Sequence, residues 1–407
     1  MFFNIQSEIG TLKSVLLHKP GKELERLTPD YLHSYLFDDI PWLRKIKEEH
    51  DEFADLLRST GAEVFYLETM LKEVLADKEI KSNFVRDLLN NCKHIYNTSL
   101  FHILYDFIYS KTPQEIAEIA TGGLDKSDVE IPKDQLHLAG FIYKDYPLYI
   151  DPLPNLYFTR DFSSVIANGI SLNTMHTVAR RRETLLIKYI YENHPLIKPH
   201  NHPLWYGPHI QHSIEGGDIL VLSDEVVAIG CSERTSPEGI ESLTRNLFKS
   251  NDTIKEVLAI YIPHLRAFMH LDTVFTMIDR DKFIIYPGIE DKLQVFSITR
   301  GSNGKINIAI RSSLIDSLRS SLKIPVLNLL QSGGGNSITA AREQWNDSTN
   351  TFAVSEGVVI TYTRNESSNE VLEKNGIKVL QINGSELVRG RGGPRCMTMP
   401  MFRENLK

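Results

Sequence analysis

The chain has 407 residues, of which 42% are hydrophobic, so it is long enough to bury a sizeable core in one large or two to three ordinary domains. Its formal net charge is −7, an acidic balance that argues against a nucleic-acid-binding protein. No apolar run approaches the roughly 18 residues that cross a bilayer, and the first residues lack a secretory signal. The three cysteines (Cys92, Cys231 and Cys396) contain no CxxC pair, which excludes a disulfide framework and a simple zinc site. We therefore expect a cytoplasmic protein with no membrane or nucleic-acid partner.

The first part of the chain alternates between predicted strands and helices. Residues 12–18 and 63–67 are apolar and predict two strands, the first ended by the Pro-Gly pair at 20–21. The Thr-Pro pair at 28–29 and the Ile-Pro pair at 40–41 predict two helix starts, because proline is favoured at the first helical position. Gly61 is placed to end the second helix.

The next part predicts helices only. Residues 62–121 contain no glycine and one proline, Pro113, and apolar residues recur there at spacings of three and four. We predict an all-helical insertion over about residues 70–142. No group of residues in it indicates chemistry.

Repeated hairpins follow from about residue 146. Two apolar strands joined by a short polar turn recur at 161–172, 218–230, 272–286 and 351–360. Helices are predicted at 182–191, 237–248 and 368–375, and further strands at 257–260 and 377–381. With the N-terminal strand–helix–strand, the unit occurs about five times, which favours a closed, repeat-built α/β architecture. An open α/β sheet is the alternative.

Three of these hairpins begin with an aspartate. If the units are related by rotation, Asp161, Asp218 and Asp272 occupy equivalent positions that converge on the axis. Such an acidic pocket would suit a cationic substrate. The alternative is that each aspartate only caps the end of a strand.

The loop at residues 389–396 carries three arginines, three glycines and Cys396. Nearby positive charge lowers the pKa of a thiol and glycines let a backbone approach a ligand, so Cys396 is a candidate nucleophile. The alternatives are a buried, inert cysteine, which is our interpretation of Cys92 and Cys231, and an anion-binding loop, although no phosphate-loop spacing occurs there.

A cysteine nucleophile needs an acid or base. His270 lies two residues before Asp272, and on an extended chain these two side chains would face the same way. Glu215 precedes Asp218 by three residues and is followed by two glycines, which would allow a tight turn, functional or structural. The absence of an HExxH motif makes a metal site a weak hypothesis.

Together these residues closely resemble the arginine deiminase family of the guanidino-group-modifying (pentein) superfamily. The resemblance covers nearly the whole chain and rests on residues 7–10 (SEIG), 36–39 (LFDD), 154–161 (PNLYFTRD), 215–218 (EGGD), 269–273 (MHLDT), 342–347 (REQWND) and the Cys396 loop. It implies a five-bladed, pseudo-symmetric α/β propeller spanning residues 1–407 as one catalytic domain, with the helical insertion at 70–142 inside it.

The resemblance also implies roles for individual residues. Cys396 corresponds to the nucleophile, His270 to the general acid and base, Glu215 to the acid beside it, and Asp161 and Asp272 to the carboxylates that bind the guanidinium. Arg180 and Arg234 correspond to the pair that receives the substrate carboxylate, and Asp218 to a supporting partner. Three further positions match substrate contacts: Asn155, Phe158 and Arg391, the last on a mobile loop.

The implied reaction is hydrolysis of L-arginine to L-citrulline and ammonia through a covalent amidino-cysteine, with no cofactor and no metal, in a homo-oligomer. A planar guanidinium held by two carboxylates would present its carbon to the sulfur. The sequence departs from the family pattern where Phe162 and Ser163 replace the usual Pro and Phe after Asp161. The alternatives are a catalytically impaired arginine-binding relative and a hydrolase of agmatine or a methylarginine.

Overall fold

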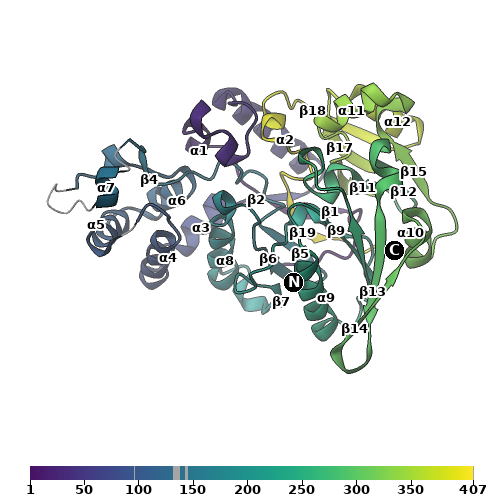
Figure 1. Cartoon of the computed structure of the whole chain (residues 1–407), viewed down its shortest axis with the longest axis horizontal. Helices are drawn as coiled ribbons and strands as arrows, with labels where there is room; N and C mark the ends of the chain where they lie inside the picture. Colours follow the sequence, from purple (N-terminus) through teal and green to yellow (C-terminus); the bar gives the residue numbers. More distant parts are fainter. Residues whose placement is uncertain (96, 132–137, 143–144, 407) are drawn as a thin grey trace.

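The two ends of the chain share one sheet. The structure is a computed structural model that describes residues 1–95, 97–131, 138–142 and 145–406. The predicted N-terminal strand is β1 (Leu12–Leu17), which pairs in parallel with β2 (Glu63–Tyr66) and antiparallel with β19 (Met399–Arg403). The labels of β1, β2 and β19 lie near the middle of the view in Figure 1, and β19 begins three residues after Cys396, so this sheet anchors the segment that carries the candidate nucleophile.

Four further sheets repeat the same pairing. Each contains an antiparallel hairpin whose second strand pairs in parallel with a third strand. The hairpins predicted from the sequence are thereby confirmed. The strands of the four sheets are β5 (Ser163–Ile166), β6 (Gly169–Leu172) and β7 (Leu204–Tyr206); β8 (Ile219–Val221), β9 (Val226–Cys231) and β10 (Glu256–Tyr261); β11 (Phe275–Met277), β12 (Lys282–Ile285) and β15 (Asn328–Gln331); and β16 (Phe352–Ser355), β17 (Val358–Tyr362) and β18 (Lys378–Ile382).

Helices connect the strands of these sheets. The three predicted helices are present as α8 (Glu183–Asn193), α9 (Pro237–Ser250) and α12 (Glu366–Lys374). The sequence did not predict α10 (Leu314–Leu322), α11 (Ser337–Trp345) or the hairpin β13 (Gln294–Arg300) and β14 (Ile306–Ile310). That hairpin extends the sheet of β8, β9 and β10 and projects from the body of the molecule (Figure 1).

The predicted helix starts near the N-terminus are only partly correct. The Pro29 segment forms a three-residue 3₁₀ turn, Pro29–Tyr31, and a short helix α1 (Lys22–Glu25) precedes it. Helix α2 (Leu43–Ser59) begins two residues after Pro41, because Trp42 is extended and serves as the N-cap. Gly61, with φ +87°, follows the helix as predicted and leads the chain toward β2.

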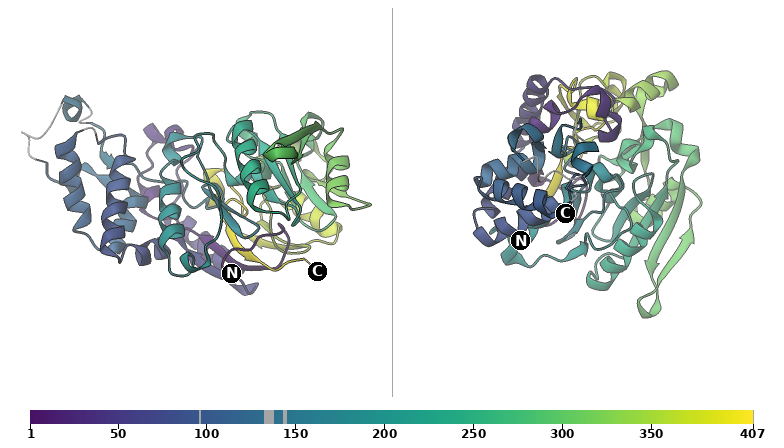
Figure 2. Two further views of the ribbon diagram at one scale, coloured as in Figure 1. Left: turned by 90° about the horizontal axis from the view of Figure 1, so that it is seen from below. Right: turned by 60° about the vertical axis from the view of Figure 1, so that its left-hand side comes forward.

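A group of helices lies at one end of the molecule, beyond the sheets (Figures 1 and 2). They are α3 (Leu67–Val74), α4 (Lys78–Asn90), α5 (Thr98–Tyr109), α6 (Pro113–Gly122) and α7 (Leu138–Ile142). Thr112 and Glu115 form a capping box at the start of α6, with Pro113 at its first position. The range 70–142 also holds the two-residue strand β3 (Leu124–Asp125), paired with β4 (Leu148–Ile150), so its described part is not entirely helical. Residues 96 and 132–137 of that range lie outside the described residues.

In the described part of the chain, none of the helices combines the length and the apolar character that crossing a membrane requires.

Candidate active site

Cys396 lies at the end of a glycine-rich loop that is packed closely against its surroundings. The thiol residue is 3% exposed. A Cβ atom at Gly392 would lie 2.2 Å from Cε1 of Phe158, and one at Gly393 would lie 2.8 Å from Cβ of Asn350. Glycine is needed at both positions because the backbone approaches these side chains too closely for any other residue.

The Cys396 sulfur has polar neighbours from two segments. Nδ2 of Asn350 donates a hydrogen bond to Sγ at 3.1 Å, and a carboxylate oxygen of Asp272 lies 3.8 Å from Sγ. Burial raises the pKa of the thiol well above its usual value, and the charges of Asp272, Asp161 and Asp347 raise it further. These surroundings therefore favour the neutral thiol. The positive charge that the sequence led us to expect around this thiol is outweighed by carboxylates.

His270 is buried between two carboxylates. Its Nε2 lies 2.8 Å from Oε2 of Glu215, and its Nδ1 lies 3.8 Å from Oδ1 of Asp161. Burial alone would lower the pKa of this imidazole, but the charges of Asp161, Glu215 and Asp218 outweigh it and raise the pKa to about 10. His270 is therefore a cation at neutral pH and can act as a proton donor.

The expectation that His270 and Asp272 lie on an extended segment of chain is wrong. Residues Leu271–Thr273 form a 3₁₀ turn rather than an extended strand. Asp218 shapes this turn, because its Oδ1 accepts a hydrogen bond from the backbone N–H of Leu271 at 2.8 Å and its Oδ2 accepts one from Ser232 at 2.7 Å. Burial raises the pKa of Asp218 to about 7.

Glu215 is completely buried and ion-paired. Burial would raise its pKa, but the hydrogen bond and charge of His270, with Arg234 and Arg180, lower it to about 2. The glycine after it, Gly216, and the next, Gly217, are required by close contacts: a Cβ at Gly217 would lie 2.5 Å from Nδ1 of His270. The Glu-Gly-Gly-Asp turn is thus shaped to hold a carboxylate against the imidazole.

Asp161 and Arg180, which the sequence assigned to opposite ends of a substrate, contact one another. Nη1 of Arg180 donates to Oδ2 of Asp161 at 2.7 Å, and Nη2 donates to Oε2 of Glu183 at 2.8 Å. Oδ1 of Asp161 is buried and has no hydrogen-bond partner among the described residues. Arg180 therefore occupies one oxygen of Asp161 and leaves the other available.

The carboxylate of Asp272 resembles that of Asp161, because one oxygen is bonded to an arginine and the other is not. Nη1 of Arg395 donates to its Oδ2 at 2.7 Å, and Nε of Arg395 donates to Glu8 at 3.0 Å. Oδ1 of Asp272 is buried and, within the described residues, accepts no hydrogen bond. Burial raises the pKa of Asp272, although Arg395 opposes the shift.

The sequence reasoning assigned no role to Glu8, Glu183, Asn350 or Arg395. Glu8 and Arg395 lie in segments that carry the family resemblance. The residues themselves could therefore be identified from the sequence, but the ion pair between them could not. Glu183 follows the arginine run that contains Arg180, at a spacing that allows an ion pair on one turn of helix. Nothing in the sequence marks Asn350.

The remaining candidate residues line one small cavity with Cys396 and His270. Arg234 donates from Nη1 to Thr177 at 2.9 Å, and Asn155 donates from Nδ2 to the carbonyl of Tyr35 at 2.7 Å. The cavity has about 20 Å³, room for about one water molecule. Its walls include Asn155, Phe158, Asp161, Arg180, Arg234, His270, Arg391 and Cys396. The structure therefore brings these predicted residues together in a closed state.

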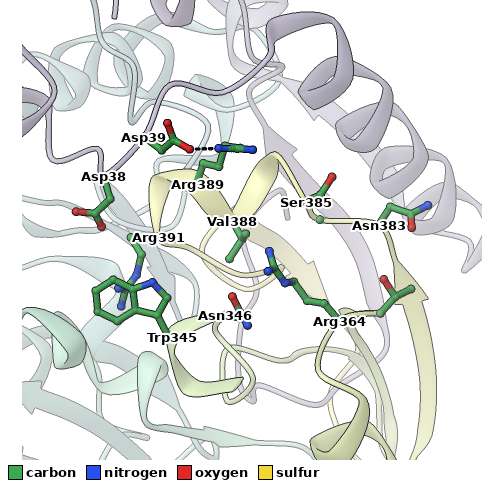
Figure 3. A pocket seen from close by; sticks show the side chains of 12 residues that line it. Asp38, Asp39, Trp345, Asn346, Arg364, Asn383, Ser385, Val388, Arg389 and Arg391 are labelled. Carbon is green, nitrogen blue, oxygen red and sulfur yellow. Dashed lines mark hydrogen bonds and ion pairs between the residues drawn. The ribbon is translucent and has the colours of Figure 1, made fainter. Parts of the chain in front are cut away.

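A larger pocket of about 600 Å³ lies beside this cavity, and Arg391 lines both. The guanidinium carbon of Arg391 lies 3.4 Å from the ring centroid of Trp345 (Figure 3). Nε and Nη1 of Arg391 are buried and, in the described part of the chain, have no hydrogen-bond partner. Arg389, on the same loop, is ion-paired with Asp39 and Glu386. Arg391 is thus part of the wall between the outer pocket and the thiol.

Asp161, Glu215 and His270 are close enough to share a metal ion in principle, since their ligand atoms lie within 4.8 Å of one another. The three residues already contact one another as ion pairs, since Nε2 of His270 lies 2.8 Å from Glu215 and Nδ1 lies 3.8 Å from Asp161. The three residues fit an ion-paired proton donor better than a metal centre.

Comparison with known proteins assigns the chain to a family. The family model for arginine deiminase matches residues 33–403. An arginine deiminase of Bacillus cereus is 46% identical over 407 residues, which cover 99% of both chains. The chain belongs to the arginine deiminase family. Arginine deiminase 1 of Staphylococcus epidermidis is also 46% identical, over 410 residues that cover 99% of this chain and 98% of its own.

Solved structures with much lower sequence identity share the fold of this arginine deiminase family member. The amidinotransferase SxtG from Microseira wollei has a TM-score of 0.55 at 15% identity and covers 99% of this chain and 98% of its own. A dimethylarginine dimethylaminohydrolase has a TM-score of 0.52 at 14% identity, with 95% and 99% covered. The mixed α/β pentein fold expected from the sequence is therefore confirmed.

The departure from the family pattern after Asp161 is accommodated inside the protein. Phe162 is completely buried, and its carbonyl accepts a hydrogen bond from the backbone N–H of Asn173 at 3.0 Å. Nδ2 of Asn173 donates to the carbonyl of Asp161 at 2.7 Å, and Ser163 donates to the sulfur of Met399 at 2.6 Å. These bonds hold the Asp161 backbone in place without the usual proline.

Proposed function

We propose that this chain is an arginine deiminase that hydrolyses L-arginine to L-citrulline and ammonia, with Cys396 as the nucleophile. The observation that carries the proposal is a pair of buried carboxylate oxygens, Oδ1 of Asp161 and Oδ1 of Asp272, that lack hydrogen-bond partners among the described residues. Buried acceptors are seldom left unpaired, and a planar cation with several N–H donors would satisfy both. A guanidinium group is such a cation.

Binding of the guanidinium also prepares the thiol. The charges of Asp161 and Asp272 help to keep Cys396 protonated. A bound cation would cancel that effect, so the thiol would release its proton to solvent and become the thiolate, which is the reactive form. Two carboxylates holding the plane of the guanidinium would also fix its carbon opposite the sulfur.

The first half of the reaction uses the proton of His270. The Cys396 thiolate adds to the guanidinium carbon, which forms a C–S bond and a neutral tetrahedral species. His270, a cation with Glu215 on its Nε2, donates a proton to one amino group, and the C–N bond breaks to release ammonia. The product of this half is an amidino-cysteine cation, and His270 is left neutral.

The second half returns every group to its starting form. Neutral His270 takes a proton from a water molecule as the oxygen adds to the same carbon. The C–S bond then breaks, and the protonated product passes its proton to the departing thiolate, which gives L-citrulline and restores the Cys396 thiol. The proton transfers and bond changes of these two halves require no metal and no organic cofactor.

Arg180 and Arg234 are proposed to receive the substrate carboxylate, and Asn155, Phe158 and Arg391 to contact the rest of the substrate. Arg234 is supported by its place in the cavity wall and by a buried Nε that has no hydrogen-bond partner among the described residues, although Glu233 lies 3.9 Å from it. Arg180 also lines the cavity, but it would have to release Asp161 or Glu183 to receive a carboxylate. Because the cavity holds about one water molecule, arginine binding requires its wall to move. Arg391, shared with the outer pocket and free of hydrogen bonds at Nε, is the part proposed to move.

The remaining proposals concern organisation. We propose that residues 1–407 form one catalytic domain in which the five sheets of like pairing are the blades of a propeller, with residues 70–142 as an insertion. Cytoplasmic location and a homo-oligomer are proposed from membership of the family.

A citrulline assay tests the proposal. The wild-type chain should release citrulline and ammonia from L-arginine in equal amounts, and Cys396→Ser should release neither. Cys231→Ser, which changes a partly buried cysteine at the end of β9, is the matched control and should retain activity. Citrulline from Cys396→Ser at the wild-type rate would contradict the role of Cys396. Arginine binding by a wild-type chain that releases no product would instead identify a non-catalytic arginine-binding protein.

A further inference from the structure

Asn350 contacts the candidate nucleophile through both ends of its side-chain amide. Nδ2 donates to Sγ of Cys396 at 3.1 Å, and Oδ1 accepts from the backbone N–H of Cys396 at 3.0 Å. Asn350 is completely buried. The amide therefore fixes both the backbone and the side chain of Cys396.

We propose that Asn350 is a catalytic residue whose amide N–H stabilises the thiolate form of Cys396 and fixes the direction in which the sulfur points. This inference rests on the proposed function in taking Cys396 as the nucleophile. A hydrogen bond from a neutral donor to an anion is stronger than one to a neutral acceptor, so the contact favours the thiolate over the thiol.

The fold holds Asn350 in this position by local contacts. Asp347 adopts the left-handed conformation with φ 58°, and the backbone N–H of Asn350 donates to its carbonyl at 3.0 Å. On the opposite side, Gly393 approaches so closely that a Cβ there would lie 2.8 Å from Oδ1 of Asn350. The side chain therefore has little freedom to turn away from the sulfur.

The charges around the thiol explain why a neutral donor matters. Three carboxylates, Asp161, Asp272 and Asp347, each disfavour the thiolate. Oδ2 of Asp272, the oxygen nearest Sγ, is already paired with Arg395. The cations that line the same cavity are His270, Arg180, Arg234 and Arg391. Among the described residues, the Asn350 amide supplies the one side-chain N–H that is hydrogen-bonded to Sγ.

A purely structural role for Asn350 makes a different prediction. In that case the important contact is the one from the Cys396 backbone N–H to Oδ1, and Asn350→Asp would preserve it, because aspartate has the same shape and keeps an acceptor oxygen there. The same substitution replaces the N–H donor at the sulfur with an oxygen and adds a fourth carboxylate. An unchanged alkylation midpoint in Asn350→Asp would therefore exclude the role of the N–H, and Asn350→Ala, which removes the donor without adding a charge, distinguishes loss of the N–H from the effect of the added carboxylate.

The experiment follows alkylation of Cys396 by iodoacetamide across pH, in the absence of arginine, with the Cys396 peptide quantified by mass spectrometry. For Asn350→Asp, the pH midpoint of alkylation should rise by about one unit or more, which is a tenfold loss of thiolate at a given pH. For the same variant, kcat for arginine should fall about tenfold or more while KM changes by less than about threefold. Asn375→Asp is the matched control, since Asn375 is an exposed asparagine at the end of α12, and it should match the wild type.

The outcomes separate this inference from the proposed function. A folded Asn350→Asp variant with the wild-type alkylation midpoint would overturn the role of Asn350, whether or not the wild type makes citrulline. A raised midpoint in a protein whose wild type makes no citrulline would support the Asn350 contact and remove the deiminase proposal. If Asn350→Asp does not fold, as judged by circular dichroism, Asn350→Ala replaces it; the inference predicts a raised midpoint there too, and an unchanged one overturns it.

Discussion

Arg234 provides a sharp test of substrate recognition. Its side chain is 5% exposed, and Nη1 is bonded to Thr177 while the guanidinium lines the cavity with Cys396. A charge-assisted hydrogen bond to a substrate carboxylate is worth roughly 1.5–3 kcal/mol. Because each 1.4 kcal/mol is about a factor of ten, Arg234→Ala should lower kcat/KM for L-arginine by roughly 10- to 150-fold. Agmatine lacks the carboxylate, so its kcat/KM should fall by less than about threefold.

The assay is ammonia release from the two substrates, which reports both reactions in the same way. Most of the loss on L-arginine should be in KM, because the carboxylate is remote from the reacting carbon. Arg245→Ala is the control, since Arg245 is an exposed arginine paired with Glu241 on α9. Equal losses on L-arginine and agmatine would refute carboxylate recognition by Arg234 and would indicate that the substitution disturbs the cavity in general.

Three other substitutions test the charges and packing of the site. Glu215→Gln should lower the pKa of His270 from about 10 by at least about one unit. In a profile of kcat against pH, the decline on the alkaline side should then begin at lower pH than in the wild type. An alkaline decline at the wild-type pH would contradict the ion pair. Glu8 has a pKa lowered to about 2, so its contribution to stability is present above about pH 4.5 and is lost as pH falls toward 2. Glu8→Gln should therefore reduce, by up to about 2 kcal/mol, the decrease in unfolding free energy that urea titrations measure between about pH 5 and pH 3, whereas identical decreases would exclude the pairing. Gly392→Ala should lower kcat/KM about tenfold or more, because the new Cβ would overlap Phe158, and wild-type kinetics would show that the loop relaxes freely.

The hairpins were predictable because their turns and apolar alternation agree. The hairpin β13–β14 was not predicted, although its turn at residues 301–304 and the alternation in β14 are signals of the same kind, and what the sequence could not show is its exposure. Ile308 and Ile310 alternate as they would in a half-buried strand, yet they are 52% and 81% exposed. Hydrophobic periodicity indicates burial only when another element covers the apolar face, and no sequence pattern says whether such an element is present.

Most residues around the cavity could be predicted because sequence motifs identify residue types. The contacts between these residues could not be predicted in this way. Asp161, Asp218 and Asp272 each interact electrostatically with His270, whereas the rotational relationship between their hairpins stays a prediction. The sequence could not show that Arg180 contacts Asp161, because that bond depends on how a loop before α8 folds back. It could not mark Asn350, whose contact with Cys396 depends on a left-handed residue and a close glycine in two distant segments. The roles assigned to these residues remain predictions.

The charge balance of the site gives a physical reason for its selectivity. Asp161 and Asp272 each use one oxygen to hold an arginine of the protein, and among the described residues the other oxygen has no hydrogen-bond partner, although Oδ1 of Asp161 lies 3.8 Å from Nδ1 of His270. Unpaired buried carboxylate oxygens are costly, and the same charges hold the thiol of Cys396 in its unreactive form. A neutral ligand with N–H donors could bond to these oxygens but would not cancel their charge, whereas a guanidinium would do both at once. Recognition of the cation and activation of the sulfur would then depend on the same two side chains, so a ligand that cannot neutralise them would meet a thiol rather than a thiolate.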